Sequence, residues 1–115
     1  MYRLLYSERA KWSLDKYFDQ FKAYYKDLYS NTGIFSEHLI QANYVEIADH
    51  LFDAIDTHIN KKLWTTEVYG RRPDPENPGQ FTLITPVVDR TLIIEYREDG
   101  ENMTRTVIEL RIFRE

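Results

Sequence analysis

The order of the hydrophobic patterns along the chain is the feature that most restricts its fold. A short apolar run at residues 2–6 leads directly into a segment with helical periodicity, and a second helical segment follows it. After a loop rich in glycine and proline, strand-like runs continue from residue 81 to residue 114. Helices and strands that are segregated in this way favour an α+β domain with the order β-α-α-β-β-β.

The two helical segments are defined by their apolar stripes and their end signals. Apolar side chains recur every three or four positions from residue 10 to 29, with Ser7 as the expected N-cap and Gly33 as the closing residue. The second helix is expected to run from a cap at Ser36 to the cations near Lys62. Neither helix could bury its stripe alone, so we expect an αα-hairpin packed on one face of a small, mostly antiparallel sheet.

Turn residues and strand-like patterns define the elements in the second half of the chain. Residues 69–79 hold three of the four prolines and two of the four glycines, which predicts a surface loop with Arg71 and Arg72 solvated in it. Strands are expected at 81–88, 90–97 and 104–114. Because Pro86 has no backbone N–H, its position must be an edge, a bulge or the end of its strand.

The turn between the last two strands fixes which side chains share a face. A two-residue turn would place Glu98 opposite Glu101, so a three-residue loop is predicted, which places Ile94 opposite Thr104 and Arg90 opposite Ile108. The face expected under the helices then carries Thr106, Ile108, Leu110 and Ile112. The opposite face, expected toward solvent or a partner, carries Arg105, Val107, Glu109, Arg111 and Phe113.

Composition narrows the class of protein. The 115 residues predict one domain, 1–115, and the absence of cysteine and of a long apolar run predicts a soluble cytoplasmic protein without a membrane partner. A net charge of −4 argues against a general nucleic-acid binder. Glu46, His50 and Asp53 share a helix face, but such a triplet is typical of a solvated acidic helix, so no metal or cofactor is expected.

Three segments together resemble the RelE/ParE family. Residues 2–10 (YRLLYSERA) are similar to the family's opening strand and to the Ser-x-x-Ala start of its first helix. Residues 90–99 (RTLIIEYRED) are similar to its strand with an arginine, an apolar run, a tyrosine and an acidic turn. Residues 107–114 (VIELRIFR) are similar to its final strand. The resemblance spans nearly the whole chain. It implies a growth-inhibiting toxin of a bacterial type II toxin–antitoxin system, neutralised by a cognate antitoxin encoded beside it.

The family divides by target. RelE-like members cut messenger RNA in the ribosome with basic residues on the open sheet face, often with a C-terminal tyrosine, whereas ParE-like members poison DNA gyrase. Residues 81–85 contain no lysine or arginine, and no tyrosine follows the last strand, so we expect the ParE-like branch with DNA gyrase as the target. A ribosome-dependent mRNA endonuclease and a catalytically inert binding or adaptor domain stay as alternatives, and no catalytic residue is assigned.

Two groups of residues are predicted to make contacts. Every basic residue after Lys62 is an arginine, whose planar fork suits carboxylate or phosphate, so we expect the sheet half to carry recognition. The expected target contacts are Arg111, Phe113 and Arg114 at the end of the last strand, with Arg90 in a more structural role. The tyrosines of the first helix outnumber what one buried stripe uses, and they are the expected antitoxin contacts: Tyr17, Tyr24, Tyr25 and Tyr29.

Overall fold

The computed structural model describes residues 1–30, 37–87 and 89–114; the side chains at 25, 26, 28–30, 37–44 and 114 lie outside this description. The elements in chain order are β1 (Arg3–Tyr6), α1 (Glu8–Ser30), α2 (Glu37–Trp64), β2 (Arg72–Pro73), β3 (Gln80–Val87), β4 (Arg90–Asp99) and β5 (Thr104–Arg114). The predicted α+β class and element order are confirmed, with the short strand β2 as an unpredicted addition. The expected helix signals at Gly33 and Ser36 lie outside the described residues.

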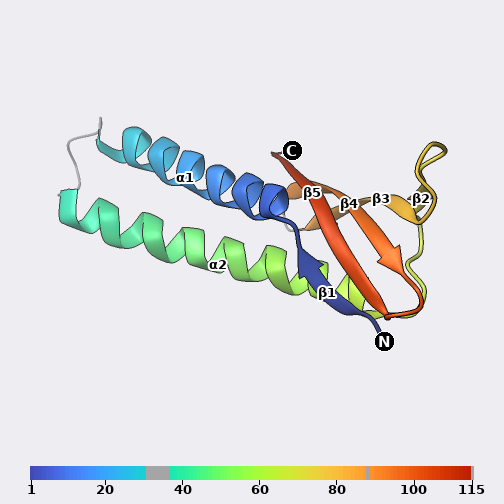
Figure 1. The fold of residues 1–115 in the computed structure, drawn as a ribbon. Coiled ribbons are helices and arrows are strands. Elements are labelled where there is room, and N and C mark those ends of the chain that lie inside the picture. Colours follow the sequence, from blue (N-terminus) through green and yellow to red (C-terminus); the bar gives the residue numbers. More distant parts are fainter. Residues whose placement is uncertain (31–36, 88, 115) are drawn as a thin grey trace.

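The sheet has the strand order β1-β5-β4-β3-β2, and only the β1–β5 pair is parallel. The two helices form the predicted αα-hairpin, which covers one face of the sheet and extends well past it (Figure 1). The molecule is therefore elongated, with principal extents of 56 × 25 × 23 Å. None of the helices in the described ranges carries an apolar stretch long enough to span a bilayer.

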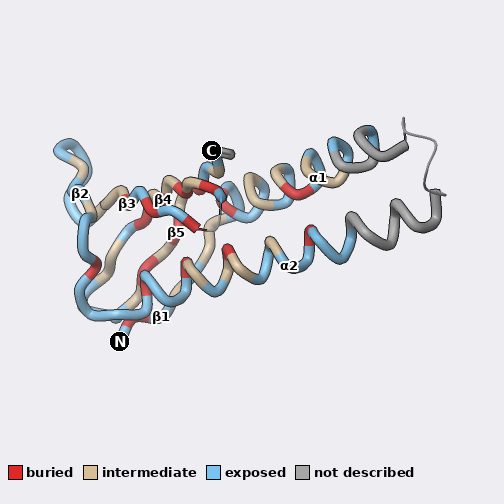
Figure 2. Tube along the Cα trace, turned by 180° about the vertical axis from the view of Figure 1, so that it is seen from behind, coloured by how far each residue is buried: buried red, intermediate tan, exposed pale blue. Residues whose placement is uncertain are grey.

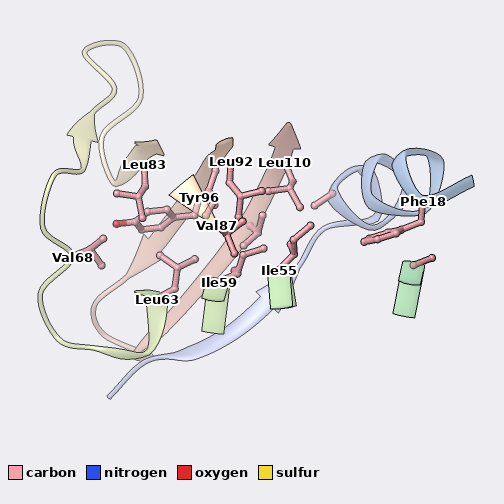
Figure 3. Packing of buried hydrophobic residues seen from close by; sticks show 14 residues of the cluster. Phe18, Ile55, Ile59, Leu63, Val68, Leu83, Val87, Leu92, Tyr96 and Leu110 are labelled. Carbon is pink, nitrogen blue, oxygen red and sulfur yellow. The ribbon is translucent and has the colours of Figure 1, made fainter. Parts of the chain in front are cut away.

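The core lies where the hairpin meets the sheet (Figure 3). Its centre consists of fully buried side chains from one helix and two strands: Ile55, Ile59, Leu63, Leu92, Ile94, Tyr96 and Val107. Each aliphatic side chain buried in this way contributes about 1.5–3 kcal/mol to folding relative to an exposed one. Among the described side chains of α2, buried positions alternate with exposed ones as in an amphipathic helix (Figure 2).

The turn between β4 and β5 differs from the prediction. Asp99 pairs with Thr104, so the loop has four residues, 100–103, and the predicted three-residue loop was wrong. The Asp99 carboxylate accepts hydrogen bonds from the Asn102 side chain and from the backbone N–H groups of Asn102 and Glu101, and these bonds lower its pKa. Met103 takes the positive φ of 52° that closes the turn. An Asp-centred turn therefore replaces the glycine-centred one.

A β-bulge at Ile108 reverses the faces of β5. Tyr96 pairs with Val107 but Glu95 pairs with Glu109, so Ile108 is an extra residue on its strand. Arg105 and Val107, before the bulge, are therefore fully buried under the helices, and Leu110, after it, is buried as well. The predicted covered face was right for Leu110 and Ile112 and wrong for Thr106 and Ile108, because a single strand parity was assumed. The predicted partners were also wrong: Ile94 pairs with Leu110, and Arg90 with Arg114.

Ser7 joins the start of α1 to this bulge. Its Oγ accepts a hydrogen bond from the backbone N–H of Ala10 at 3.1 Å, which confirms the predicted N-cap. The same hydroxyl donates to the carbonyl of Ile108 at 3.0 Å, and the Ser7 N–H donates to the carbonyl of Val107 at 2.9 Å. One residue therefore caps a helix and satisfies the carbonyl at the irregularity of the strand.

Pro86 lies near the end of β3, where it pairs with Thr91 of β4. On the other side of β3, β2 pairs only with Phe81 and Thr82. The position without an N–H therefore lies on the part of β3 that has a single neighbouring strand, as predicted.

Candidate functional site

The sheet face turned away from the helices carries an apolar patch. Ile84 of β3 pairs with Ile93 of β4, and in the next row Pro86 and Phe113 of β5 flank the same strand at Thr91. Ile84 is 55% exposed and Phe113 is 50% exposed, whereas Leu83 and Thr85, which flank Ile84 on the opposite face, are buried. We call the group formed by Ile84, Pro86, Ile93 and Phe113 the open-face patch.

Charged side chains beside the patch neutralise one another. Arg111 pairs with Ile93 across the strands, and its guanidinium lies 3.6 Å from a carboxylate oxygen of Glu95 and 3.6 Å from one of Glu109. Arg9 of α1 donates a hydrogen bond to Glu109 at 3.3 Å. Two arginines thus face two glutamates, so this part of the face presents alternating charges rather than a cationic field.

The predicted target contacts are separated by the fold. Arg111 and Phe113 lie on the same face and are both exposed. Arg90 is buried, its Nε donates to the hydroxyl of Tyr17 at 2.7 Å, and its Nη1 contacts the Asp89 carboxylate without hydrogen-bond geometry. Arg90 therefore ties β4 to α1 and does not reach the open face. The side chain of Arg114 lies outside the described residues.

The four tyrosines expected at the antitoxin surface also divide. Tyr17 is half-buried, packs against the core and holds Arg90, so it serves the fold. Tyr24 is exposed. The side chains of Tyr25 and Tyr29 lie outside the described residues. Of the described pair, only Tyr24 offers its ring to a partner.

A buried arginine at the end of α2 was missed by the sequence reasoning. Arg105 is fully buried, and its guanidinium donates to the carbonyls of Leu63, Thr65 and Thr66, which are the last carbonyls of α2 and the residues after it. A cation at this position also suits the helix dipole. The prediction that Arg105 faces solvent was wrong. The available signal was that α2 ends without a closing glycine, so its last carbonyls needed donors from elsewhere.

Glu98 joins Arg105 to Arg71. Its Oε1 accepts from Arg105 Nε at 2.9 Å and from Arg71 Nη1 at 2.8 Å. Burial acts to raise the pKa of Glu98, but the hydrogen bonds from both arginines outweigh it and the pKa is lowered. Arg71 also stacks 3.8 Å from the centre of the Phe81 ring. The prediction of a solvated Arg71 was therefore wrong: this cluster is a structural anchor between the loop, the sheet and α2.

No protein-family model, curated protein or solved structure matches this chain. In the described part of the chain, no group of His, Asp and Glu side chains has the arrangement of a metal site. Glu46 and His50 form only an exposed contact of 3.9 Å along α2. The fold and the surface chemistry of the open face are therefore the grounds for a functional proposal.

His58 gives the fold a testable pH dependence. Its Nε2 lies 2.9 Å from Oγ1 of the buried Thr85, and burial, with the charges of Lys62 and Lys61, lowers its pKa from the ordinary 6.5. The folded state therefore binds this proton less readily than the unfolded state. The free energy of unfolding keeps its full value above the pKa of the unfolded state, and it falls as the pH drops below that value and through the lower pKa of the folded state. We expect His58→Gln to lose less melting temperature than the wild type between about pH 7 and pH 5. Circular dichroism measures both melting temperatures. An equal decrease of the melting temperature in the variant and the wild type would contradict this role of His58.

Proposed function

We propose that this protein is the toxin of a bacterial toxin–antitoxin pair of the RelE/ParE type, and that it inhibits growth by binding DNA gyrase. The proposal is supported by the β-α-α-β-β-β fold with its parallel β1–β5 pair, which agrees with the fold that the resemblance implies. The observation that carries the choice of target is the composition of the open face, where an apolar patch lies beside charge-balanced side chains.

Such a face suits a protein target better than RNA. The cores of protein interfaces are enriched in aromatic and arginine side chains, as at Phe113 and Arg111. Binding of a phosphate would instead need unpaired cations, and here Glu95 and Glu109 accompany Arg111. None of the five strands contains a lysine or a histidine, so this sheet lacks the side chain that most readily moves a proton at neutral pH.

The test combines growth with two purified assays. Induced expression should stop growth, and co-expression of the neighbouring small gene should restore it. The purified protein should inhibit supercoiling by gyrase or trap cleaved DNA, and it should leave ribosome-bound messages intact. Cleavage of those messages with unaffected gyrase would instead assign a ribosome-dependent endonuclease. Normal growth and no effect in either assay would assign an inert adaptor domain.

A further inference from the structure

A groove runs between α1 and α2. Two depressions, of about 310 Å³ and about 250 Å³, adjoin one another along this seam, because Asp15 of α1 and Phe52 of α2 line both. Tyr6 of β1 lines the second depression, which places that end of the groove beside the junction of β1 and α1. On α1 the lining extends from Lys11 to Lys22, a length of about 16 Å at the helical rise of ~1.5 Å per residue.

The floor of this groove is apolar. It consists of side chains from both helices: Leu14, Phe18, Ala48 and Phe52. The rings of Phe18 and Phe52 lie 5.2 Å apart between centroids; Phe18 is 7% exposed, whereas Phe52 is 39% exposed. In helix bundles, a third helix packs over the seam of two antiparallel helices and covers partly exposed large side chains there.

The rim of the groove is acidic. It carries four carboxylates, two from each helix: Asp15, Asp19, Asp49 and Asp56. Within the described residues none of these four forms an ion pair with a basic side chain. Lys11 and Lys22 lie at the two ends, and Lys11 is already paired with Glu8 at 3.6 Å. The groove therefore has a negative potential over an apolar floor.

We propose that this groove binds an amphipathic helix of a partner protein whose apolar edge is flanked by lysine or arginine. The apolar edge would cover Phe52 and the floor beside it, and cations on both flanks would reach Asp15 and Asp49. A length of about 16 Å accommodates about three helical turns. Nucleic acids and acidic segments are repelled by the rim. That this partner is the neutralising antitoxin rests on the proposed function, whereas the recognition of a basic amphipathic helix does not.

The probe is a fluorescein-labelled peptide of about 14 leucine and lysine residues, patterned as an amphipathic helix, and its counterpart has glutamate at every lysine. Fluorescence anisotropy with the full chain measures both dissociation constants. We expect the lysine peptide to bind and the glutamate peptide not to bind. Asp15→Asn combined with Asp49→Asn should weaken binding about tenfold, since two charge contacts are lost.

Glu76→Gln combined with Glu101→Gln is the matched control, because it removes two exposed charges away from the groove and should change affinity less than about twofold. Phe52→Ala, with folding verified by circular dichroism, should also weaken binding. Equal affinities of the two double variants, equal binding of both peptides, or no binding of the lysine peptide would overturn the proposal. Arg111→Ala with Phe113→Ala should leave the affinity for the lysine peptide unchanged. Loss of growth inhibition can therefore be distinguished from loss of peptide binding in the groove.

Discussion

Replacing Arg105 with methionine is expected to lower the free energy of unfolding by about 3–5 kcal/mol, the range for removing one partner from a buried ionic network. Methionine fills much of the same volume, so the loss comes from polar groups rather than from a cavity. The carbonyls of Leu63, Thr65 and Thr66 lose their donor, and Glu98 keeps only Arg71. Each buried acceptor left without a donor costs about 1–3 kcal/mol.

Arg97→Met is the matched control for this experiment. Arg97 lies on the neighbouring strand and is exposed, so its replacement should change stability by less than about 0.5 kcal/mol. Arg105→Lys keeps the charge but not the planar fork that reaches three carbonyls and a carboxylate, so an intermediate loss is expected. Urea denaturation of the three variants measures all of these changes. A loss below about 1 kcal/mol in Arg105→Met would show that other groups satisfy the end of α2.

The elements that local pattern defines were predictable. The periodicity of α1 and the cap at Ser7 depend on residues within one or two helical turns, and the structure confirms both. Arg105 shows the limit of such reasoning. Its hydrogen-bond partner Leu63 is 42 positions away in the sequence, so no pattern within β5 indicated that this charged side chain is buried.

The open-face patch depends on the register of β4 and β5, which the sequence did not determine. Ile94 pairs with Leu110, six positions from the Thr104 that the predicted loop implied. A shift of this size leaves the alternation of Arg111 and Phe113 intact, since that depends on β5 alone. It changes which residues of β4 lie beside them, so the contact of Arg111 with Glu95 emerged only from the structure.

Alanine at both Arg111 and Phe113 is expected to abolish growth inhibition. Both side chains are exposed on the same face, and an aromatic and an arginine at the centre of an interface contribute about 2 kcal/mol or more each. Losing both should weaken target binding at least about a hundredfold. Stability should change by less than about 1 kcal/mol, because neither side chain belongs to the core. Growth curves, thermal denaturation and co-purification with the antitoxin measure the three properties.

Two further double variants complete this experiment: the first is a matched control, and the second tests whether the open face binds a protein or RNA. Tyr69→Ala with Arg72→Ala removes an exposed aromatic and an exposed arginine near the β2 end of the sheet, so it should keep full inhibition. Glu95→Gln with Glu109→Gln frees Arg111 from its two carboxylates. If the target is a protein whose charged side chains contact both the arginine and the glutamates of this face, this variant should inhibit growth less than the wild type. Stronger inhibition accompanied by cut messages would show that the freed cation binds RNA, because removing two negative charges strengthens phosphate binding.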